Sequence, residues 1–322
     1  MTECENFFVG ITLLQIKIIL KIIQKKKLKK NNCILLYYST ESTKSERYYL
    51  RKIKPYCKKI ILMRNKIPFP FYFFEIKKKF KNYLIKNAYI SNINGIYDQY
   101  LMSVTKPNRI FTFDDGAGNL YKNTKYNIGE DFNYLRKVIY YLLGNRYSTN
   151  RFIRERVNHF TIFKNYKNYS SKKIIKLNLF RMKEITSLKK MKECNIILGT
   201  VINEYFLHIK NKFLIKDKVK KFIKNSGKSF FYIKHPRGQN IDNLYFDKLK
   251  IINSKKIAED FIIEELLTKY KIINLYGFPV STAQINLEGF KNVNNFILHT
   301  DNLPQRALDG MKTLKKYKTI KI

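Results

Sequence analysis

The sequence has little of several residue types, and each shortage excludes a class of protein. Its 322 residues include no tryptophan, 12 glycines and 7 prolines, which excludes a collagen-like or low-complexity chain. The longest apolar stretch, residues 11–23, is interrupted by Lys17 and Lys21 and is shorter than the roughly 20 residues that a membrane span needs. The chain starts with an acidic segment, residues 1–5, where an export signal is basic, so we expect no export signal.

Cysteine is scarce as well. The four cysteines, Cys4, Cys33, Cys57 and Cys194, show neither a Cys-x-x-Cys pair nor the spacing of metal ligands. Scattered cysteines in a chain of this length are typical of reduced, packed thiols in a cytosolic protein, with one disulfide pair as the alternative. We therefore expect a cytoplasmic location.

Acidic residues are few relative to basic ones. The 24 Asp and Glu residues stand against 64 Lys and Arg, which gives a net charge of +40. Such a charge favours a polyanionic partner, either nucleic acid or an anionic membrane surface. Lysine greatly outnumbers arginine, whereas base readout favours the planar arginine fork. We therefore expect no nucleic-acid partner and a peripheral contact with anionic lipid, to which each basic residue contributes roughly 1 kcal/mol.

Apolar residues are plentiful, at 45% of the chain, and suffice for two cores. Several apolar runs are continuous rather than alternating, which is typical of parallel strands buried on both faces. Helical stretches separate them, near residues 13–30, 73–86, 130–143 and 216–225. The predicted strands are residues 6–12, 33–38, 59–63 and 109–113 in the first half, and residues 195–200, 229–233 and 271–276 in the second.

This strand–helix rhythm occurs twice, with a polar segment between the two series at residues 164–176. We therefore predict an α/β fold with two Rossmann-like domains, residues 1–170 and residues 171–322. Ligands of such sheets bind beyond the carboxyl ends of the strands. Polar groups fall at the carboxyl ends of predicted strands at residues 114–116, 199–200, 235–236 and 281–282.

The first polar group, Asp114, Asp115 and Gly116, lies in the run FDDGAGN at residues 113–119. An Asp-Gly pair is ordinary turn chemistry, but a turn needs only one carboxylate. A second carboxylate that faces a cleft can act as general base on an alcohol. Two adjacent carboxylates also suit a hard metal ion, although no third ligand is evident in the sequence.

His235 lies in the run KHPR at residues 234–237, between a predicted strand and a proline. Imidazole titrates near neutrality, so it can donate a hydrogen bond or a proton to a leaving phosphate. A lone histidine is more often structural. The other three histidines, His159, His208 and His299, lack this setting.

Two further candidates follow in the second half. Ser281 and Thr282 open a predicted helix, where hydroxyls and backbone N–H groups bind anions, although an ordinary N-cap has the same sequence. Glu264 is placed either to bind a ribose diol or to begin a solvated helix.

In this order the motifs resemble glycosyltransferase family 52, the bacterial lipooligosaccharide sialyltransferases of GT-B architecture. The likeness rests on residues 8–15, 113–119, 234–237 and 277–282. Two departures keep the physical character of the family's motifs. Residues 13–15 read Leu-Leu-Gln in place of Thr-Pro-Leu-Gln, and Ser281 is followed by Thr282 in place of a second serine.

The resemblance implies two Rossmann-like domains facing across a cleft, the first on the acceptor side and the second binding a CMP-sugar. It implies transfer of sialic acid from CMP-sialic acid to a terminal galactose of lipooligosaccharide, with inversion at the anomeric carbon. No cofactor or metal is implied, and a homodimer on the cytoplasmic face of the inner membrane is suggested. A family member with another donor sugar, such as glucose, is the alternative, and a non-enzymatic polyanion-binding protein is the least favoured.

Residue roles follow from the same resemblance. Asp115 is the expected base, and Glu204, after the first strand of the second domain, is its rival. His235 is expected to stabilise or protonate the departing phosphate. The expected donor-binding residues are Gly199, Thr200, Lys234, Pro236, Glu264, Gly277, Phe278, Ser281 and Thr282, and the expected acceptor-side residues are Thr12, Gln15, Asp114 and Gly116.

Overall fold

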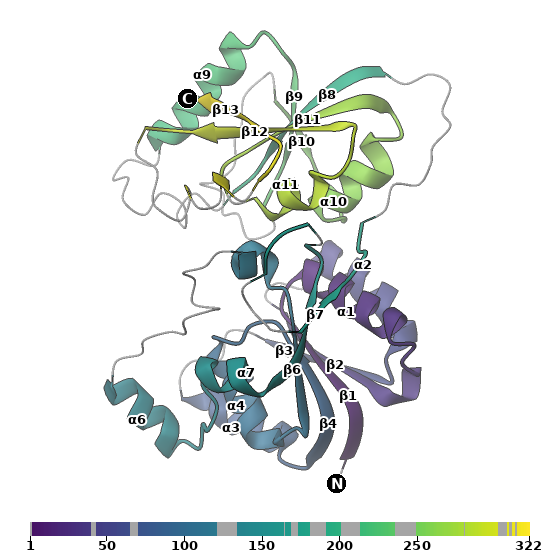
Figure 1. Ribbon diagram of the computed structural model, residues 1–322, viewed down its shortest axis with the longest axis vertical. Coiled ribbons are helices and arrows are strands. Elements are labelled where there is room, and N and C mark those ends of the chain that lie inside the picture. Colours follow the sequence, from purple (N-terminus) through teal and green to yellow (C-terminus); the bar gives the residue numbers. More distant parts are fainter. Residues whose placement is uncertain are drawn as a thin grey trace. The chain divides into compact units, whose positions relative to one another are not determined.

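The computed structural model contains two compact units, Met1–Leu179 and Phe180–Ile322, each built on one parallel β-sheet (Figure 1). None of the described helices is both long and apolar enough to cross a bilayer. The structure describes residues 2–39, 43–64, 70–120, 134–163, 165–168, 173–180, 191–200, 213–235, 249–279, 281–301, 308, 311–312 and 314–322.

The first unit holds seven strands in the order β3-β2-β1-β4-β5-β6-β7, and every neighbouring pair is parallel. The chain leaves β1 on one side for β2 and β3 and then returns to the other side for β4. The switch in strand order therefore lies between β1 and β4, the place where ligands bind in such sheets. The strands are β1 Thr2–Gly10, β2 Cys33–Ser39, β3 Lys59–Arg64, β4 Tyr83–Ile90, β5 Arg109–Phe113, β6 Arg156–Thr161 and β7 Ile174–Lys176.

The helices of this unit cover the sheet, and α1 shows how local sequence starts one. Thr12 is its N-cap and forms a capping box with Gln15, so the helix begins directly after β1. On the sheet, Phe8 stacks on Tyr89 at 4.4 Å between ring centroids, and Tyr89 stacks on Phe111 at 4.8 Å, which ties β1, β4 and β5 together. The helices are α1 Leu13–Lys25, α2 Lys44–Ile53, α3 Phe71–Phe80, α4 Ile96–Thr105, α6 Tyr134–Leu142 and α7 Thr149–Glu155, and the 3₁₀ turns are Lys30–Asn32, Lys54–Tyr56 and Gly116–Leu120.

The second unit holds six parallel strands in the order β10-β9-β8-β11-β12-β13, with its switch between β8 and β11. Side-chain amides fix the register of three strands, because Asn274 donates to Asn195 at 3.0 Å and Asn294 donates to Asn274 at 3.0 Å. The elements are β8 Met191–Leu198, α9 Phe213–Asn225, β9 Phe230–Ile233, β10 Leu249–Ile252, α10 Ala258–Phe261, the π-helical turn Ile262–Leu266, β11 Tyr270–Gly277, α11 Thr282–Leu287, β12 Val293–His299 and β13 Lys318–Lys321.

The predicted class, two α/β domains with parallel sheets, is confirmed. The helix predicted over residues 73–86 is wrong at its end, because α3 stops at Phe80 and the chain then enters β4, a central strand of the sheet. The predicted boundary at residue 170 precedes β7, which pairs with β6, so the first unit extends to Leu179. All four cysteines are buried and free, as the sequence predicts.

Candidate active site

The two aspartates after β5 have different environments. Asp114 is fully buried, and its carboxylate accepts hydrogen bonds from the backbone N–H of Ile162 at 2.7 Å and from the side-chain amide of Asn119 at 3.3 Å. Asp115, the next residue, is only half-buried. Asp114 therefore anchors the loop to the end of β6, and its carboxylate lies inside the first unit rather than at a surface that an acceptor can reach.

His159 completes this anchor, although the sequence gives it no distinctive setting. It is 1% exposed, and its Nε2 lies 3.0 Å from Oδ1 of Asp114. Its Nδ1 lies 2.9 Å from the hydroxyl of Thr112. With the proton on Nε2, the ring donates to Asp114 and accepts from Thr112, so both ring nitrogens are satisfied.

Gln15 holds the carboxylate of Asp115. The side-chain oxygen of Gln15 accepts hydrogen bonds from the backbone N–H groups of Ile11 at 2.6 Å and Thr12 at 3.2 Å. This fixes the orientation of the amide, and its Nε2 donates to Oδ1 of Asp115 at 2.6 Å. Gly116 follows with a φ of 64°, a left-handed conformation that favours glycine. The predicted residues Thr12, Gln15, Asp115 and Gly116 thus come together at the carboxyl edge of β1 and β5.

A third carboxyl group, Asp98, belongs to the same edge, and the sequence analysis did not select it. It lies in the first turn of α4, is 1% exposed, and neither of its oxygens has a hydrogen-bond partner among the described residues. Burial, followed by the charge of Asp115, raises the pKa of Asp98 well above its usual range. No local signal in the sequence distinguishes it from a helix-starting aspartate.

In the second unit, Gly199 brings β8 and β9 together. Its N–H donates to the carbonyl of Ile233 at 2.7 Å, and a Cβ at this position would lie 2.5 Å from the backbone nitrogen of His235. Only glycine allows this approach without a shift of the backbone. Half-buried Thr200, Lys234 and His235 therefore meet at the ends of these two strands.

Gln284 plays the corresponding anchoring role at the end of β11. It is fully buried and donates from Nε2 to the carbonyls of Leu275 at 3.1 Å and Phe296 at 3.0 Å. A Cβ on Gly277 would lie 2.6 Å from its side-chain oxygen. The N-cap Ser281 accepts from the N–H of Gln284, which places Ser281 and Thr282 at this strand end. Phe278, by contrast, is buried in the core of the unit.

Glu264 has a different setting from the one expected of a ribose ligand. It lies in the π-helical turn Ile262–Leu266, and its side chain is 45% exposed. Lys256 bridges it and Glu265, with its Nζ 2.8 Å from Glu264 and 2.5 Å from Glu265. Two residues of the expected site, Glu204 and Pro236, lie outside the described residues.

The rest of the described residues offers no competing centre. No group of three or more His, Cys, Asp or Glu side chains there is placed to hold a metal ion. A cavity of about 590 Å³ opens at the amino-terminal edge of the first sheet and is lined by residues that include Glu3, Asn32 and Lys106. Ligands of doubly wound sheets bind at the opposite, carboxyl edge, so the strand-end residues remain the candidate site.

The close approach at Gly199 yields a test. We expect Gly199→Ala to lower the free energy of unfolding by about 1–3 kcal/mol, because the methyl group meets backbone atoms that must shift. Gly289→Ala is the matched control, since a Cβ at Gly289 meets nothing within 4 Å. Urea denaturation of both variants measures the difference, and equal stabilities would contradict the packing described here.

The chain matches proteins whose sequences and structures are known. Over 288 residues it is 25% identical to CMP-N-acetylneuraminate:beta-galactoside alpha-2,3-sialyltransferase of Pasteurella multocida, a match that covers 88% of this chain and 87% of the relative. Over 230 residues it is 26% identical to N-acetyllactosaminide alpha-2,3-sialyltransferase of Haemophilus influenzae, with 70% of this chain and 68% of the relative covered.

Solved structures resemble it at the level of fold. The UDP-GlcNAc 2-epimerase of Neisseria meningitidis bound to UDP-GlcNAc gives a TM-score of 0.58 at 10% identity and covers 96% of this chain and 85% of the epimerase. The S. aureus MnaA-UDP co-structure gives a TM-score of 0.54 at 11% identity, with 93% of this chain and 80% of that chain covered. The fold is therefore GT-B-like.

The model of glycosyltransferase family 52 matches residues 9–302, nearly the whole chain. This span contains the strand ends of both units, where the polar residues gather. The chain is a glycosyltransferase, and it belongs to glycosyltransferase family 52.

Proposed function

We propose that this enzyme transfers sialic acid from CMP-sialic acid to a terminal galactose of lipooligosaccharide, with inversion at the anomeric carbon. The observation that carries the proposal is the carboxylate of Asp115, fixed by Gln15 at a strand end of the first unit. The names of the relatives support the donor and the sugar that accepts it, because both are alpha-2,3-sialyltransferases.

Asp115 is the proposed general base. Inversion needs a base that takes the proton of the acceptor hydroxyl as its oxygen attacks the anomeric carbon, by analogy with inverting glycosidases. Gln15 holds the Asp115 carboxylate at the strand end through a hydrogen bond to Oδ1. Asp114 contributes by holding the loop in place from inside the domain. Thr12 and Gly116 shape the acceptor side next to it.

His235 is the proposed partner of the leaving group. As the bond from the anomeric carbon to the phosphate oxygen breaks, the imidazole donates a hydrogen bond or a proton to that oxygen. Gly199 holds the backbone of His235 close to β8, and Thr200 and Lys234 lie beside it. The hydroxyls of Ser281 and Thr282 are further donors for the phosphate, so no metal ion is needed.

Four further residues are the proposed contacts of the nucleoside. Pro236 and Gly277 are proposed to lie next to the nucleoside, and Gly277 lets the chain pass close to Gln284. Phe278 contributes through the core beneath the site. Glu264 binds the ribose only if donor binding draws it away from Lys256, its ion-pair partner.

A transfer assay tests the proposal. We expect CMP release and a sialylated product from CMP-sialic acid and a galactose-terminated lipooligosaccharide, at the same rate with and without a chelator. His235→Ala is expected to lower kcat by about 100-fold or more, the usual size of a proton-transfer contribution. His299→Ala is the matched control, a histidine at the end of β12 in the same sheet.

Other outcomes of this assay would overturn the proposal. Strict dependence on a divalent metal would contradict the mechanism. Turnover of another sugar nucleotide, such as a glucose donor, with none of CMP-sialic acid, would assign the enzyme to a different reaction within the family.

We also propose that the enzyme works as a peripheral protein on the cytoplasmic face of the inner membrane, and that α6 makes the contact. Leu135, Ile139 and Leu142 lie on one face of α6 and are 68%, 45% and 77% exposed. Arg136 and Lys137 are exposed on the same helix. Exposed apolar side chains next to cations suit an anionic bilayer surface, and the chain's net charge of +40 favours the same partner.

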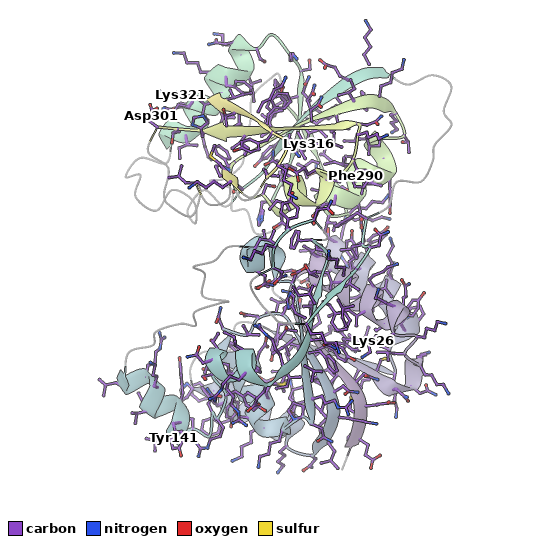
Figure 2. All side chains as sticks on the ribbon, in the orientation of Figure 1. Lys26, Tyr141, Phe290, Asp301, Lys316 and Lys321 are labelled. Atoms are coloured by element: carbon purple, nitrogen blue, oxygen red, sulfur yellow. The ribbon has the colours of Figure 1, made fainter. Side chains whose placement is uncertain are left out.

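The position of α6 fits this role. In Figure 1 it lies at the outer side of the first unit, and Figure 2 shows Tyr141 on its outward side. The Tyr141 side chain is 59% exposed. Tyr140 is buried and contacts Phe73 of α3, with 5.9 Å between ring centroids, so this side chain attaches the helix to the first unit.

A vesicle-binding experiment tests the role of α6. Leu135→Ser with Leu142→Ser is expected to weaken binding to phosphatidylglycerol vesicles about tenfold or more, since each buried leucine contributes roughly 1.5–3 kcal/mol. Leu84→Ser, at an exposed leucine on β4, is the control and should bind like the unchanged protein. Undiminished vesicle binding by the double variant would contradict the proposal. A double variant that binds vesicles normally but changes from dimer to monomer would assign α6 to self-association.

A further inference from the structure

Asp98 differs from the other buried polar side chains of α4. Gln99 donates to the carbonyl of Ile93 at 3.1 Å, Ser103 donates to Asn145 at 2.9 Å, and Thr105 donates to the carbonyl of Leu101 at 2.8 Å. Both oxygens of Asp98 are buried with no hydrogen-bond partner among the described residues. A buried polar group without a partner is costly, so its presence needs an explanation.

The topology places Asp98 beside the proposed base. β4 pairs with β1 on one side and with β5 on the other, and all three run in the same direction. Gln15 follows β1, Asp98 follows β4 and Asp115 follows β5, so the three side chains lie at one edge of three adjacent strands. This edge is also the switch point of the sheet.

Other titratable groups face Asp98 from neighbouring elements. Tyr38, at the end of β2, is buried, and its hydroxyl has no hydrogen-bond partner in the described part of the chain. The ring of Tyr97 in α4 lies 5.8 Å from the ring of Tyr38. Burial is the main cause that raises the pKa of Tyr38 well above its usual range, so Tyr38 stays neutral. Asp115 is the ionised group that acts on Asp98 itself.

Two opposing effects decide the protonation state of Asp98. The N-terminus of α4 favours an ionised carboxylate in its first turn. Burial without a hydrogen bond disfavours the ionised form, and a second negative charge at Asp115 disfavours it further. The cost of burying an unpaired carboxylate is larger than the effect of a helix terminus, so the neutral acid prevails.

We propose that Asp98 and Asp115 act as a carboxyl pair with a single negative charge, in which Asp98 keeps a proton and is a positioning residue that holds Asp115 in its ionised, basic form. When two carboxyl groups interact, the pair binds its first proton more tightly than its second. The environments of the two groups decide which of them holds that first proton. Asp98 is buried without a partner, whereas Asp115 is half-exposed and hydrogen-bonded to Gln15.

The pair has a defined role in the reaction, which rests on the proposed function. The proton of the acceptor hydroxyl moves to Asp115 as the new bond from oxygen to the anomeric carbon forms, while Asp98 keeps its own proton throughout. The pair passes from one negative charge to none, and the proton leaves Asp115 for solvent after the product departs.

Protonation of Asp98 is measured without any turnover. Between the pKa of an aspartate in the unfolded chain, about 4, and its raised pKa in the folded protein, the group binds a proton only in the folded state. Over that pH range the unfolding constant rises about tenfold per pH unit, and the rise stops once the folded group ionises. We therefore expect the ratio of unfolding constants, unchanged protein over Asp98→Asn, to rise with pH above about 4 and then level off. A ratio that stays constant from pH 4 to 9 would overturn the proposal.

The coupling to Asp115 is tested by repeating the series with Asp115→Asn in both proteins. Removal of that charge lets Asp98 ionise at lower pH, so the ratio is expected to level off at a lower pH. If the ratio of unfolding constants levels off at the same pH in both series, Asp98 is not paired with Asp115. If a variant does not fold, carbon-13 shifts of labelled aspartate carboxyls in the unchanged protein give the same answer, and the absence of a protonated carboxyl at pH 7 would overturn the proposal.

The pH profile of kcat/KM connects the pair to catalysis. The unchanged enzyme is expected to show an alkaline inflection where Asp98 ionises, and Asp98→Asn is expected to lose that inflection. A purely structural role for Asp98 would leave the inflection in place. If no variant transfers sialic acid while the unfolding ratio behaves as expected, the proposed function fails and the carboxyl pair stands.

Discussion

Both sheets are parallel throughout their described strands, and this constraint brings the strand-end residues of each unit together. In a parallel sheet the carboxyl ends of all strands meet at one edge, so residues that are far apart in sequence become neighbours there. Gln15 and Asp115 are 100 positions apart and share a hydrogen bond of 2.6 Å because β1 and β5 both flank β4. In the second unit the same geometry joins Gly199 to His235 and Gly277 to Gln284.

At the strand ends, a buried polar residue anchors the loop and a neighbouring polar residue lies at the edge of the sheet. Asp114 binds His159 and the N–H of Ile162, which leaves Asp115 at the edge. Gln284 binds two strand carbonyls, which leaves Ser281 at the start of α11. Buried hydrogen bonds of this kind make a loop rigid, and a rigid loop keeps the neighbouring side chain in place.

The sequence predicts the elements whose signal is local. The run at residues 33–38 is apolar throughout and forms β2, buried along that length. β4 and β6 mix polar and apolar residues, and their place in the sheet depends on pairing with strands distant in sequence, so no local pattern marks them. The predicted domain boundary precedes the observed one for the same reason, because β7 is identified only by its pairing with β6.

The site divides in a similar way. Asp115, His235 and Ser281 follow strands directly, so their position predicts a place at the edge of a sheet. His159 and Gln284 are identified by hydrogen bonds across the fold, and Asp98 by its burial without a partner, none of which the sequence displays. Asp114 and Asp115 are adjacent in sequence, and their burial distinguishes the fully buried anchor from the half-buried carboxylate.

The central claim is that the base comes from the first domain, at Asp115, and not from Glu204 of the second. Asp115→Asn and Glu204→Gln are matched, because each replaces a carboxylate by an amide of the same shape. The account predicts that kcat for transfer from CMP-sialic acid falls by about 100-fold or more in Asp115→Asn and stays within a few-fold of the unchanged enzyme in Glu204→Gln. A loss in Glu204→Gln with turnover kept in Asp115→Asn would contradict it.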